Sequence, residues 1–232
     1  MHILLTRPLD DCKDLIIKFK SLGHMVSHLP VIEIKKKIHK NIDFGEYSGV
    51  VFTSSNSIKN LSNNKLNKNI LCFCVGASTE KEAKKNGFQN IFAAEGNVKN
   101  LKEIILKNFD KNDGKLIYVS GEIISSDLDK ELISEGYSVE RIINYSVAHV
   151  QNIKPEFFKE LKKSMPDVVY IYSENSAKSF MEIVKKNHIE DEWMNTNLMC
   201  IGEKTATIVN EIKWKKIFLF NSGEEEYLLY KI

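Results

Sequence analysis

Short apolar runs alternate with amphipathic segments along the whole chain. The apolar runs predict strands, and the segments with apolar residues every three or four positions predict helices. Several apolar runs are continuous, which is typical of parallel strands covered on both faces. The predicted strands are 2–6, 25–34, 48–53, 70–75, 90–93, 115–120, 138–149, 167–172, 197–201 and 216–220. The predicted helices are 8–22, 56–63, 78–87, 97–109, 123–136, 155–164, 175–187, 203–212 and 223–231. This alternation predicts an α/β fold with doubly wound parallel sheets.

Four sequence patterns occur twice, in the same order, and each time the second copy lies about half the chain further on. The pairs are FTSSNSIKNL at 52–61 with IYSENSAKSF at 171–180, CVGAST at 74–79 with CIGEKT at 200–205, SLGHMV at 21–26 with SEGYSV at 134–139, and Gly96 and Leu101 with Gly223 and Leu228. We infer a duplicated unit of about half the chain. Two similar α/β units that face each other form a cleft, and clefts bind ligands.

Two β-rich segments, 29–38 and 142–150, interrupt the alternation at corresponding positions of the two repeats. Neither is followed at once by a helix, so we expect them to run side by side as a connector between two domains. The first domain is then discontinuous, and the first βα piece of each repeat crosses to the other domain. The expected boundaries are 1–33 plus 151–232 for the first domain, 38–143 for the second, and 34–37 with 144–150 for the linker strands.

Composition narrows the class of protein. The chain has 232 residues, 43% of them hydrophobic, and a net charge of +2, which gives no argument for a nucleic-acid partner. The four cysteines form no CxxC pair, and Cys72 and Cys74 are expected to be buried thiols on one face of a strand. The first residues are charged too soon for a signal peptide, and no apolar run reaches the roughly 20 residues of a membrane span. We therefore expect a cytoplasmic protein with no membrane partner.

The repeated FTSSNS and IYSENS segments predict a strand, a small polar turn and a helix. Backbone N–H groups at such a helix start can receive an anion, assisted by the helix dipole. Simple N-capping by the serine and asparagine side chains is the alternative. Two matched copies favour ligand binding, and the candidate residues are Thr53, Ser54, Ser55, Asn56, Ser173, Asn175 and Ser176.

Three further turns follow predicted strands. Neither a G-x-G-x-x-G fingerprint nor a P-loop is present, so no dinucleotide or nucleotide site is indicated. In open α/β sheets ligands bind at the carboxyl ends of the strands, where these turns lie. Small polar turns in this number suggest a ligand with many acceptor oxygens. The candidates are Gly76, Ser78, Thr79, Gly121, Glu122, Gly202, Lys204 and Thr205.

Few residues are candidates for catalysis. There is no G-x-S-x-G or HExxH motif, and His24 and His28 lie on a predicted strand, so no metal site is expected. Tyr145, in the connector, can donate a hydrogen bond or protonate a leaving group; a half-buried strand tyrosine is the alternative. Arg7 ends the first strand, where it either binds an anion or forms a surface ion pair.

The TS-x-N-S turns, the VG-x-x-T and IG-x-x-T turns and especially INYSVAHV at 143–150 resemble uroporphyrinogen-III synthases. The resemblance extends from LLTRP at 4–8 to SGEEEYLL at 222–229. It implies two flavodoxin-like α/β domains joined by a two-stranded linker, with the active site between them. It also implies a monomeric, cofactor-free lyase of haem biosynthesis.

The implied substrate is hydroxymethylbilane, a linear tetrapyrrole with eight carboxylates. Loss of the ring A hydroxyl as water gives an azafulvene, which ring D attacks through its substituted carbon. The resulting spiro intermediate opens and recloses with ring D inverted. The resemblance assigns Tyr145 as the acid and places Ser54, Ser173 and Thr205 at polar turn positions. Some relatives have basic residues where this chain has Asn56 and Ser125, so backbone donors are expected to matter more here.

Two other classes of protein share parts of this pattern. A two-lobed, non-catalytic binding protein for a small anion would show the same duplicated sheets. A receiver-type regulatory module would need an acidic cluster after its first strand, where this chain has Thr6, Arg7 and Pro8.

Overall fold

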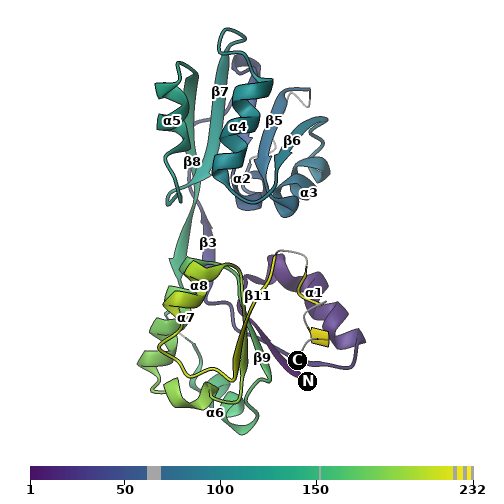
Figure 1. Cartoon of the computed structure of the whole chain (residues 1–232), viewed down its shortest axis with the longest axis vertical. Coiled ribbons are helices and arrows are strands. Elements are labelled where there is room, and N and C mark those ends of the chain that lie inside the picture. The colour runs from purple at the N-terminus through teal and green to yellow at the C-terminus, as the bar shows by residue number, and fades with distance from the viewer. Residues whose placement is uncertain (62–68, 152, 222–223, 227–228, 231–232) are drawn as a thin grey trace. The chain divides into compact units, whose positions relative to one another are not determined.

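The computed structural model describes residues 1–61, 69–151, 153–221, 224–226 and 229–230, in which the chain forms two compact units (Figure 1). The first unit contains Met1–Glu33 and Ala148–Ile232, and the second contains Ile34–Val147. The chain leaves the first unit within strand β3 (Ile32–Lys36) and returns within β8 (Ser138–His149). Of the residues expected to form a linker, 34–37 and 144–147 cluster with the second unit and 148–150 with the first. Their role as a linker stays a prediction.

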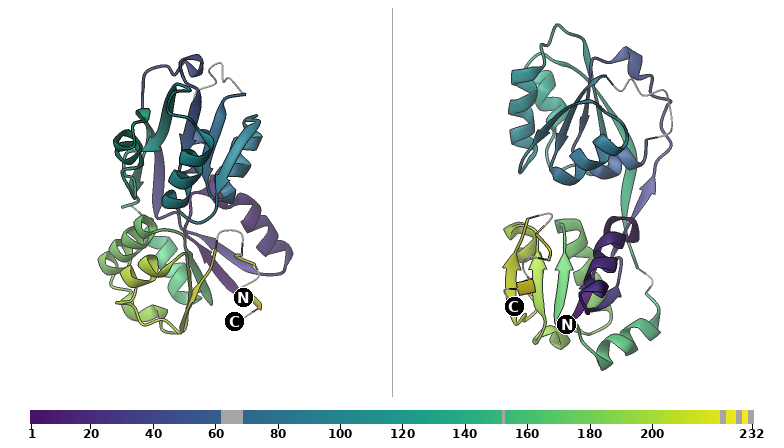
Figure 2. Two further views of the ribbon diagram at one scale, coloured as in Figure 1. Left: turned by 45° about the horizontal axis from the view of Figure 1, so that its top comes forward. Right: turned by 90° about the vertical axis from the view of Figure 1, so that its right-hand side faces the viewer.

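The first unit is a parallel sheet with the order β11-β10-β9-β1-β2. Its strands are β1 (His2–Leu5), β2 (Met25–His28), β9 (Val168–Ile171), β10 (Asn197–Cys200) and β11 (Lys216–Leu219). Helix α1 (Leu9–Ser21) packs on one face. The other face packs against α6 (Pro155–Lys163), α7 (Glu174–Lys186), the 3-10 helix η2 (Glu190–Trp193) and α8 (Glu203–Ile208). The sheet is therefore doubly wound, as predicted (Figure 2).

The second unit has the order β3-β8-β7-β4-β5-β6. Its remaining strands are β4 (Gly49–Phe52), β5 (Leu71–Val75), β6 (Asn90–Ala94) and β7 (Lys115–Gly121). The 3-10 helix η1 (Phe44–Glu46), α2 (Ser55–Lys59) and α3 (Ala77–Lys85) cover one face. Helices α4 (Val98–Asn108) and α5 (Leu128–Ser134) cover the other. Cys72 and Cys74 are buried together on the α2–α3 face, which confirms the prediction for these thiols.

The two sheets have the same strand register under the displacements seen in the sequence. The displacement between SLGHMV and SEGYSV takes the neighbours Ile3 and Val26 onto Leu116 and Val139, which are also neighbours. The same correspondence holds across each sheet, since Ile3 faces Val168 in one unit and Leu116 faces Gly49 in the other. Strands β1 and β2 of the first repeat thus complete the sheet of the second repeat, and β7 and β8 do the reverse. Gly223 and Leu228 of the faintest repeat lie outside the described residues.

The predicted strand 25–34 is wrong as a single element, because the chain changes sheets there. The backbone N–H groups of Leu29 and Val31 still donate to Leu5 and Thr6 of the first sheet. Pro30 between them has no N–H to donate. From Ile32 the chain pairs with β8 instead. Val150 N donates to Val31 O, and Lys37 N donates to Asn144 O, so the two strands are antiparallel.

Some helix ends also differ from the predictions. The helix expected over 123–136 begins only at Leu128, because Ser125 and Ser126 are poor helix formers. The helix expected over 203–212 ends at Ile208, and the one over 56–63 ends at Lys59. Residues 62–63 lie outside the described residues, as do residues 223, 227, 228 and 231 of the helix predicted over 223–231. The described residues of that segment, 224–226 and 229–230, form no α-helix. No helix in the described part of the chain is long and apolar enough to cross a membrane.

The residues that precede α3 and α8 are both glycines, and they share a backbone conformation that is strained for any other residue. Gly76 has φ 80° and ψ 151°, and Gly202 has φ 76° and ψ 155°, a region that only glycine occupies readily. Among the described residues beyond the adjoining chain, no atom lies within 4 Å of an added Cβ at either glycine. We expect Gly76→Ala and Gly202→Ala each to lower the free energy of unfolding by about 1–3 kcal/mol, from backbone strain alone. Denaturant unfolding measures the loss; Lys81→Ala, exposed on α3, should stay within about 0.5 kcal/mol of wild type. Equal stability of the glycine variants and this control would contradict the prediction.

Candidate functional site

The candidate residues gather at the carboxyl ends of the parallel strands in each unit. In the second unit, Thr53–Asn56 follow β4, Gly76–Thr79 follow β5, and Gly121 ends β7. Because the three strands are parallel, these ends lie on one edge of the sheet. The strand order reverses between β7 and β4, which is where open α/β sheets bind ligands.

Tyr145 is a buried residue of the second unit, with 8% of its surface exposed. Its ring packs directly on Gly121, because a Cβ built there would lie 2.6 Å from Tyr145 Cζ and 2.9 Å from the phenol oxygen. Burial raises the pKa of the phenol, and the hydroxyls of Ser54 and Ser57 oppose that shift. Ser57 Oγ nevertheless makes no hydrogen bond of standard geometry within the described residues. Tyr145 is therefore protonated at neutral pH and sits beside the TSSNS turn.

A β-bulge gives Tyr145 this orientation. Ser120 of β7 faces Ile143 of β8, but the next residue, Gly121, faces Tyr145, so Asn144 is the extra residue. Regular alternation would point Tyr145 to the same face as Ile143. The bulge instead buries Asn144 and Tyr145 in succession, near α2.

The TSSNS turn is partly exposed and caps α2. Ser54 Oγ accepts a hydrogen bond from Asn56 N at 3.2 Å, which is the N-capping expected as the alternative interpretation. Thr53 Oγ1 lies 2.9 Å from the hydroxyl of Tyr118. Thr53, Ser54, Ser55 and Asn56 are each half-buried, so part of each residue is open to solvent.

The first unit presents the matching turn beside a stacked arginine. Ser173 Oγ accepts from Ser176 N at 3.2 Å and lies 2.9 Å from Ser176 Oγ, so Ser176 is buried in the cap. Asn175 is half-buried. The strand order of this sheet reverses between β9 and β1. Arg7 follows β1 and Tyr172 follows β9, and the guanidinium lies 4.4 Å from the centre of the Tyr172 ring. Arg7 therefore stacks on an aromatic ring, and both its anion-binding role and the alternative of a surface ion pair stay predictions.

The glycine turns divide into exposed and buried parts. Ser78 and Lys204 are exposed, whereas Thr79 and Thr205 are only 2% and 3% exposed. These threonine side chains pack into the start of their helices, and Thr79 N donates to Gly76 O. At the end of β7, Gly121 is buried under Tyr145, and the next residue, Glu122, is exposed and paired with Lys37.

Three residues at these strand ends were missed from the sequence. Arg141 of β8 donates from Nε to Ser120 Oγ at 2.8 Å and from Nη2 to the carbonyl of Gly121 at 2.9 Å. Asn144 Nδ2 donates to Ser57 O at 2.7 Å. Tyr172 has a phenol with no hydrogen-bond partner in the described residues, and burial raises its pKa well above the usual value. The position of Asn144 next to Tyr145 was the one available signal.

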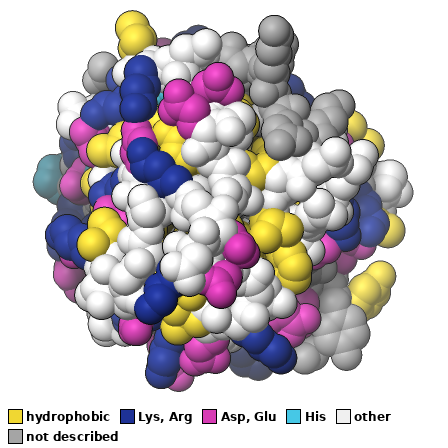
Figure 3. Space-filling model, turned by 90° about the horizontal axis from the view of Figure 1, so that it is seen from above, with side chains coloured by type: hydrophobic (Ala, Val, Ile, Leu, Met, Phe, Trp, Pro, Cys, Tyr) yellow, Lys and Arg dark blue, Asp and Glu magenta, His cyan; other side chains and the backbone are white. Residues whose placement is uncertain are grey.

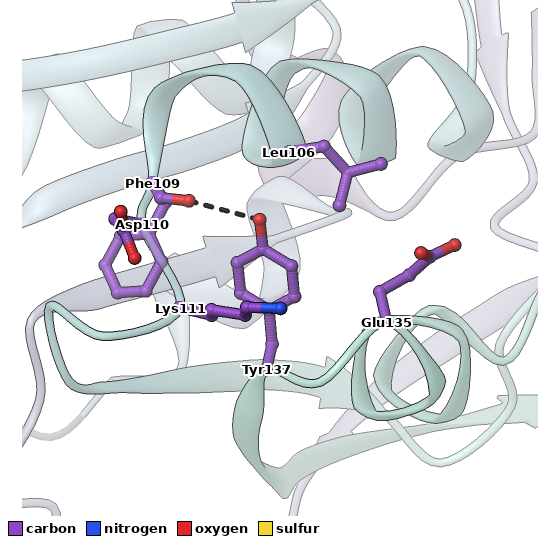
Figure 4. Close-up of a pocket in the computed structure, with 6 residues that line it drawn as sticks. All are labelled: Leu106, Phe109, Asp110, Lys111, Glu135 and Tyr137. Carbon is purple, nitrogen blue, oxygen red and sulfur yellow. Dashed lines mark hydrogen bonds between the residues drawn. The ribbon is translucent and has the colours of Figure 1, made fainter.

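Other parts of the molecule offer less for a substrate. A pocket of about 290 Å³ lies at the opposite edge of the second sheet, where Tyr137 donates to the carbonyl of Phe109 at 3.2 Å (Figure 4). That edge carries the amino ends of the strands, and it contains none of the candidate residues. Within the described residues, no group of three His, Cys, Asp or Glu side chains is placed to hold a metal.

Comparisons with known proteins identify the family. The family model described as HEM4, uroporphyrinogen-III synthase HemD, matches residues 13–219. The fold is similar to that of uroporphyrinogen-III synthetase from Helicobacter pylori 26695, with TM-score 0.64 and 19% identity over 100% of this chain and 99% of that one. A mutant uroporphyrinogen III synthase from the extremely thermophilic bacterium Thermus thermophilus has TM-score 0.54 and 14% identity over 100% and 97%. No curated protein matches the chain. The matches do not favour a non-catalytic binding protein, and the chain belongs to the uroporphyrinogen-III synthase family.

Proposed function

We propose that the chain converts hydroxymethylbilane to uroporphyrinogen III, the reaction of its family, without a cofactor. The observation that carries the proposal is Tyr145, a protonated phenol at the edge of the sheet where open α/β sheets bind ligands. The family of the chain is shown by the match over residues 13–219. The reaction needs one proton donor, and the rest of the task is to orient a flexible tetrapyrrole so that the substituted carbon of ring D attacks.

Tyr145 acts as the general acid in this proposal. It donates its proton to the hydroxyl of ring A as the carbon–oxygen bond breaks, so that water leaves with the electron pair of that bond. The pyrroles stabilise the azafulvene cation. After ring D has inverted, the ring-closing carbon loses its hydrogen as a proton, which restores the phenol. The net change is loss of one water.

The turn residues of each unit bind the substrate carboxylates. Two groups support this role best: the half-buried residues Thr53–Asn56, and the stacked Arg7 with Ser173 and Asn175 in the other unit. The exposed Ser78 and Lys204 add donors, while Gly76 and Gly202 bring backbone N–H groups close to a ligand. Thr79, Thr205 and Ser176, being buried, act through the backbone and by shaping the turns. Gly121 supports the acid; Glu122 acts through its ion pair with Lys37, since its carboxylate would repel the substrate.

The protein acts as a cytoplasmic monomer in this proposal, with the small-molecule substrate as its partner. On the face seen in Figure 3, basic and acidic side chains are interspersed among hydrophobic ones. The net charge of +2 agrees with a mixed surface, which favours neither nucleic acid nor an acidic membrane. The family's substrate is a soluble anion, which fits a cytoplasmic enzyme.

The isomer of the product tests the function. Hydroxymethylbilane, made enzymatically, is supplied to the protein, and the oxidised uroporphyrins are resolved by chromatography. We expect isomer III in excess over isomer I, at a rate proportional to protein concentration. Isomer I alone, at the rate seen without protein, would rule out synthase activity.

A further inference from the structure

We propose that Arg141 and Asn144 are positioning residues that hold the bulge of β8 and thereby aim Tyr145 at the reacting hydroxyl. The inference rests on the proposed role of Tyr145 and extends it to two residues that act through the position of the tyrosine. It depends on contacts within the second unit alone.

Arg141 fixes the β7 side of the bulge. Its guanidinium donates to Ser120 Oγ, to Gly121 O at 2.9 Å and to Glu122 O at 3.2 Å. These groups lie at and just after the register shift between Ser120 and Gly121, so the arginine side chain binds β7 where the strand pairing becomes irregular. A lysine has no planar set of donors and cannot reproduce the three contacts.

Asn144 fixes the other side. As the extra residue of β8, it is fully buried and donates from Nδ2 to Ser57 O, within α2. Its own carbonyl accepts from Lys37 N at 2.9 Å. The bulge is thereby tied to a helix on one side and to β3 on the other.

The contacts of Arg141 and Asn144 together determine the position of Tyr145. Glu122 N donates to Tyr145 O at 2.9 Å, so the backbone that Arg141 holds is bonded to the backbone of the tyrosine. The ring then lies on Gly121, with the hydroxyls of Ser54 and Ser57 beside the phenol. If the bulge relaxed to regular pairing, alternation would turn the phenol to the face of Ile143.

The other unit gives an internal comparison. The displacement that takes Ile3 onto Leu116 also takes His28 onto Arg141, and His28 Nε2 lies 2.8 Å from the carbonyl of Arg7. In each unit, a side chain at this register position therefore contacts the carboxyl end of the neighbouring strand, which is β1 for His28 and β7 for Arg141. Only the second unit adds the extra residue and the tyrosine, which links the arginine and bulge to the chemistry of that unit.

The test combines kinetics with a double-mutant cycle. Arg141→Met, Arg141→Lys and Asn144→Ser are each expected to lower kcat about 10- to 100-fold with little change in KM, because a misplacement of about 1 Å has effects of this size. In a Tyr145→Phe background the same substitutions should change kcat less than about twofold. Lys115→Met, which removes the ion pair with Glu140 at the far end of the same two strands, should keep wild-type kcat. Full additivity of the losses, or an unchanged kcat in Arg141→Met, would overturn the proposal.

A second measurement does not depend on activity. Protein carrying tyrosine labelled with ¹³C at Cζ is titrated, and the Tyr145 signal is assigned by its loss in Tyr145→Phe. Arg141→Met and Asn144→Ser should move the chemical shift and pKa of that signal, while Lys115→Met should not. An unmoved signal in folded Arg141→Met would overturn the proposal even if isomer III is formed. Failure to form isomer III with a moved signal would instead contradict the proposed function alone.

Discussion

Tyr145→Phe is expected to lower kcat by about 100- to 10,000-fold, the usual contribution of a general acid, while leaving binding of uroporphyrinogen III nearly unchanged. Phenylalanine keeps the ring that packs on Gly121 and removes only the phenol oxygen. Steady-state rates of isomer III formation and equilibrium binding of the product separate the two effects. Equal loss of product affinity and rate would assign Tyr145 to binding instead of proton transfer.

The pH dependence of the wild type provides a check on the same role. An acid must be protonated, and burial raises the pKa of this phenol, so kcat should stay level through neutral pH and fall only at alkaline pH. Tyr145→Phe should lose that alkaline fall. Tyr137→Phe is the matched control, because it removes a phenol that bonds to Phe109 O at the opposite edge of the same sheet. We expect Tyr137→Phe to cost about 1 kcal/mol of stability and to leave kcat unchanged.

The strand-end location of the candidate residues could be predicted because it follows from topology. Continuous apolar runs and the repeated turns indicate parallel strands, and parallel strands bring residues such as Thr53 and Gly121 to one edge wherever they lie in the sequence. The shift in sequence number that relates Ile3 to Leu116 also relates the paired residues of β1 and β2 to the paired residues of β7 and β8. Sequence order and strand pairing are sufficient for this level of description.

The orientation of the side chains could not be predicted in the same way. One extra residue in β8 reverses the face of Tyr145, and INYSV has no glycine or other local signal for that bulge. Arg141 has the sequence position of an ordinary strand residue, and its three acceptors lie 19 to 21 positions away in the sequence. The burial of Thr79 and Thr205 likewise depends on how each helix packs on its sheet.

The crossing of the chain between sheets was also only partly visible. Pro30 has no N–H for a strand ladder, but the β-rich run over 25–34 favoured one strand. The N–H groups on either side of the proline, of Leu29 and Val31, donate to Leu5 O and Thr6 O at the end of β1. Within the described residues, these are the last backbone hydrogen bonds between this segment and the first sheet. From Ile32 the chain pairs with β8 of the second sheet. Such a change of partner is a tertiary effect with no local pattern of its own.

Gly121→Ala is expected to lower kcat about 100-fold without changing any hydrogen-bonding side chain of the site. The new methyl group would lie 2.6 Å from Cζ and 2.9 Å from Cε2 of Tyr145, so the ring must move by the order of 1 Å. The backbone at Gly121 has no left-handed φ, so the substitution acts through crowding of the ring and not through local backbone strain. Rates of isomer III formation measure the loss, and product binding should change much less than kcat.

Gly49→Ala separates displacement of the acid from general destabilisation. An added Cβ there would lie 2.6 Å from Leu116 Cδ2, in the core of the same unit and at the amino end of β4. Both alanine variants crowd a packed site, and overpacking of this kind costs about 1–3 kcal/mol. Only Gly121→Ala moves the phenol, so it alone should lower the rate of the folded enzyme. In a Tyr145→Phe background its effect on kcat should nearly vanish, because the acid is already absent. Equal rates in Gly121→Ala and Gly49→Ala at matched folded fractions would contradict the idea that the contact between Gly121 and Tyr145 places the acid.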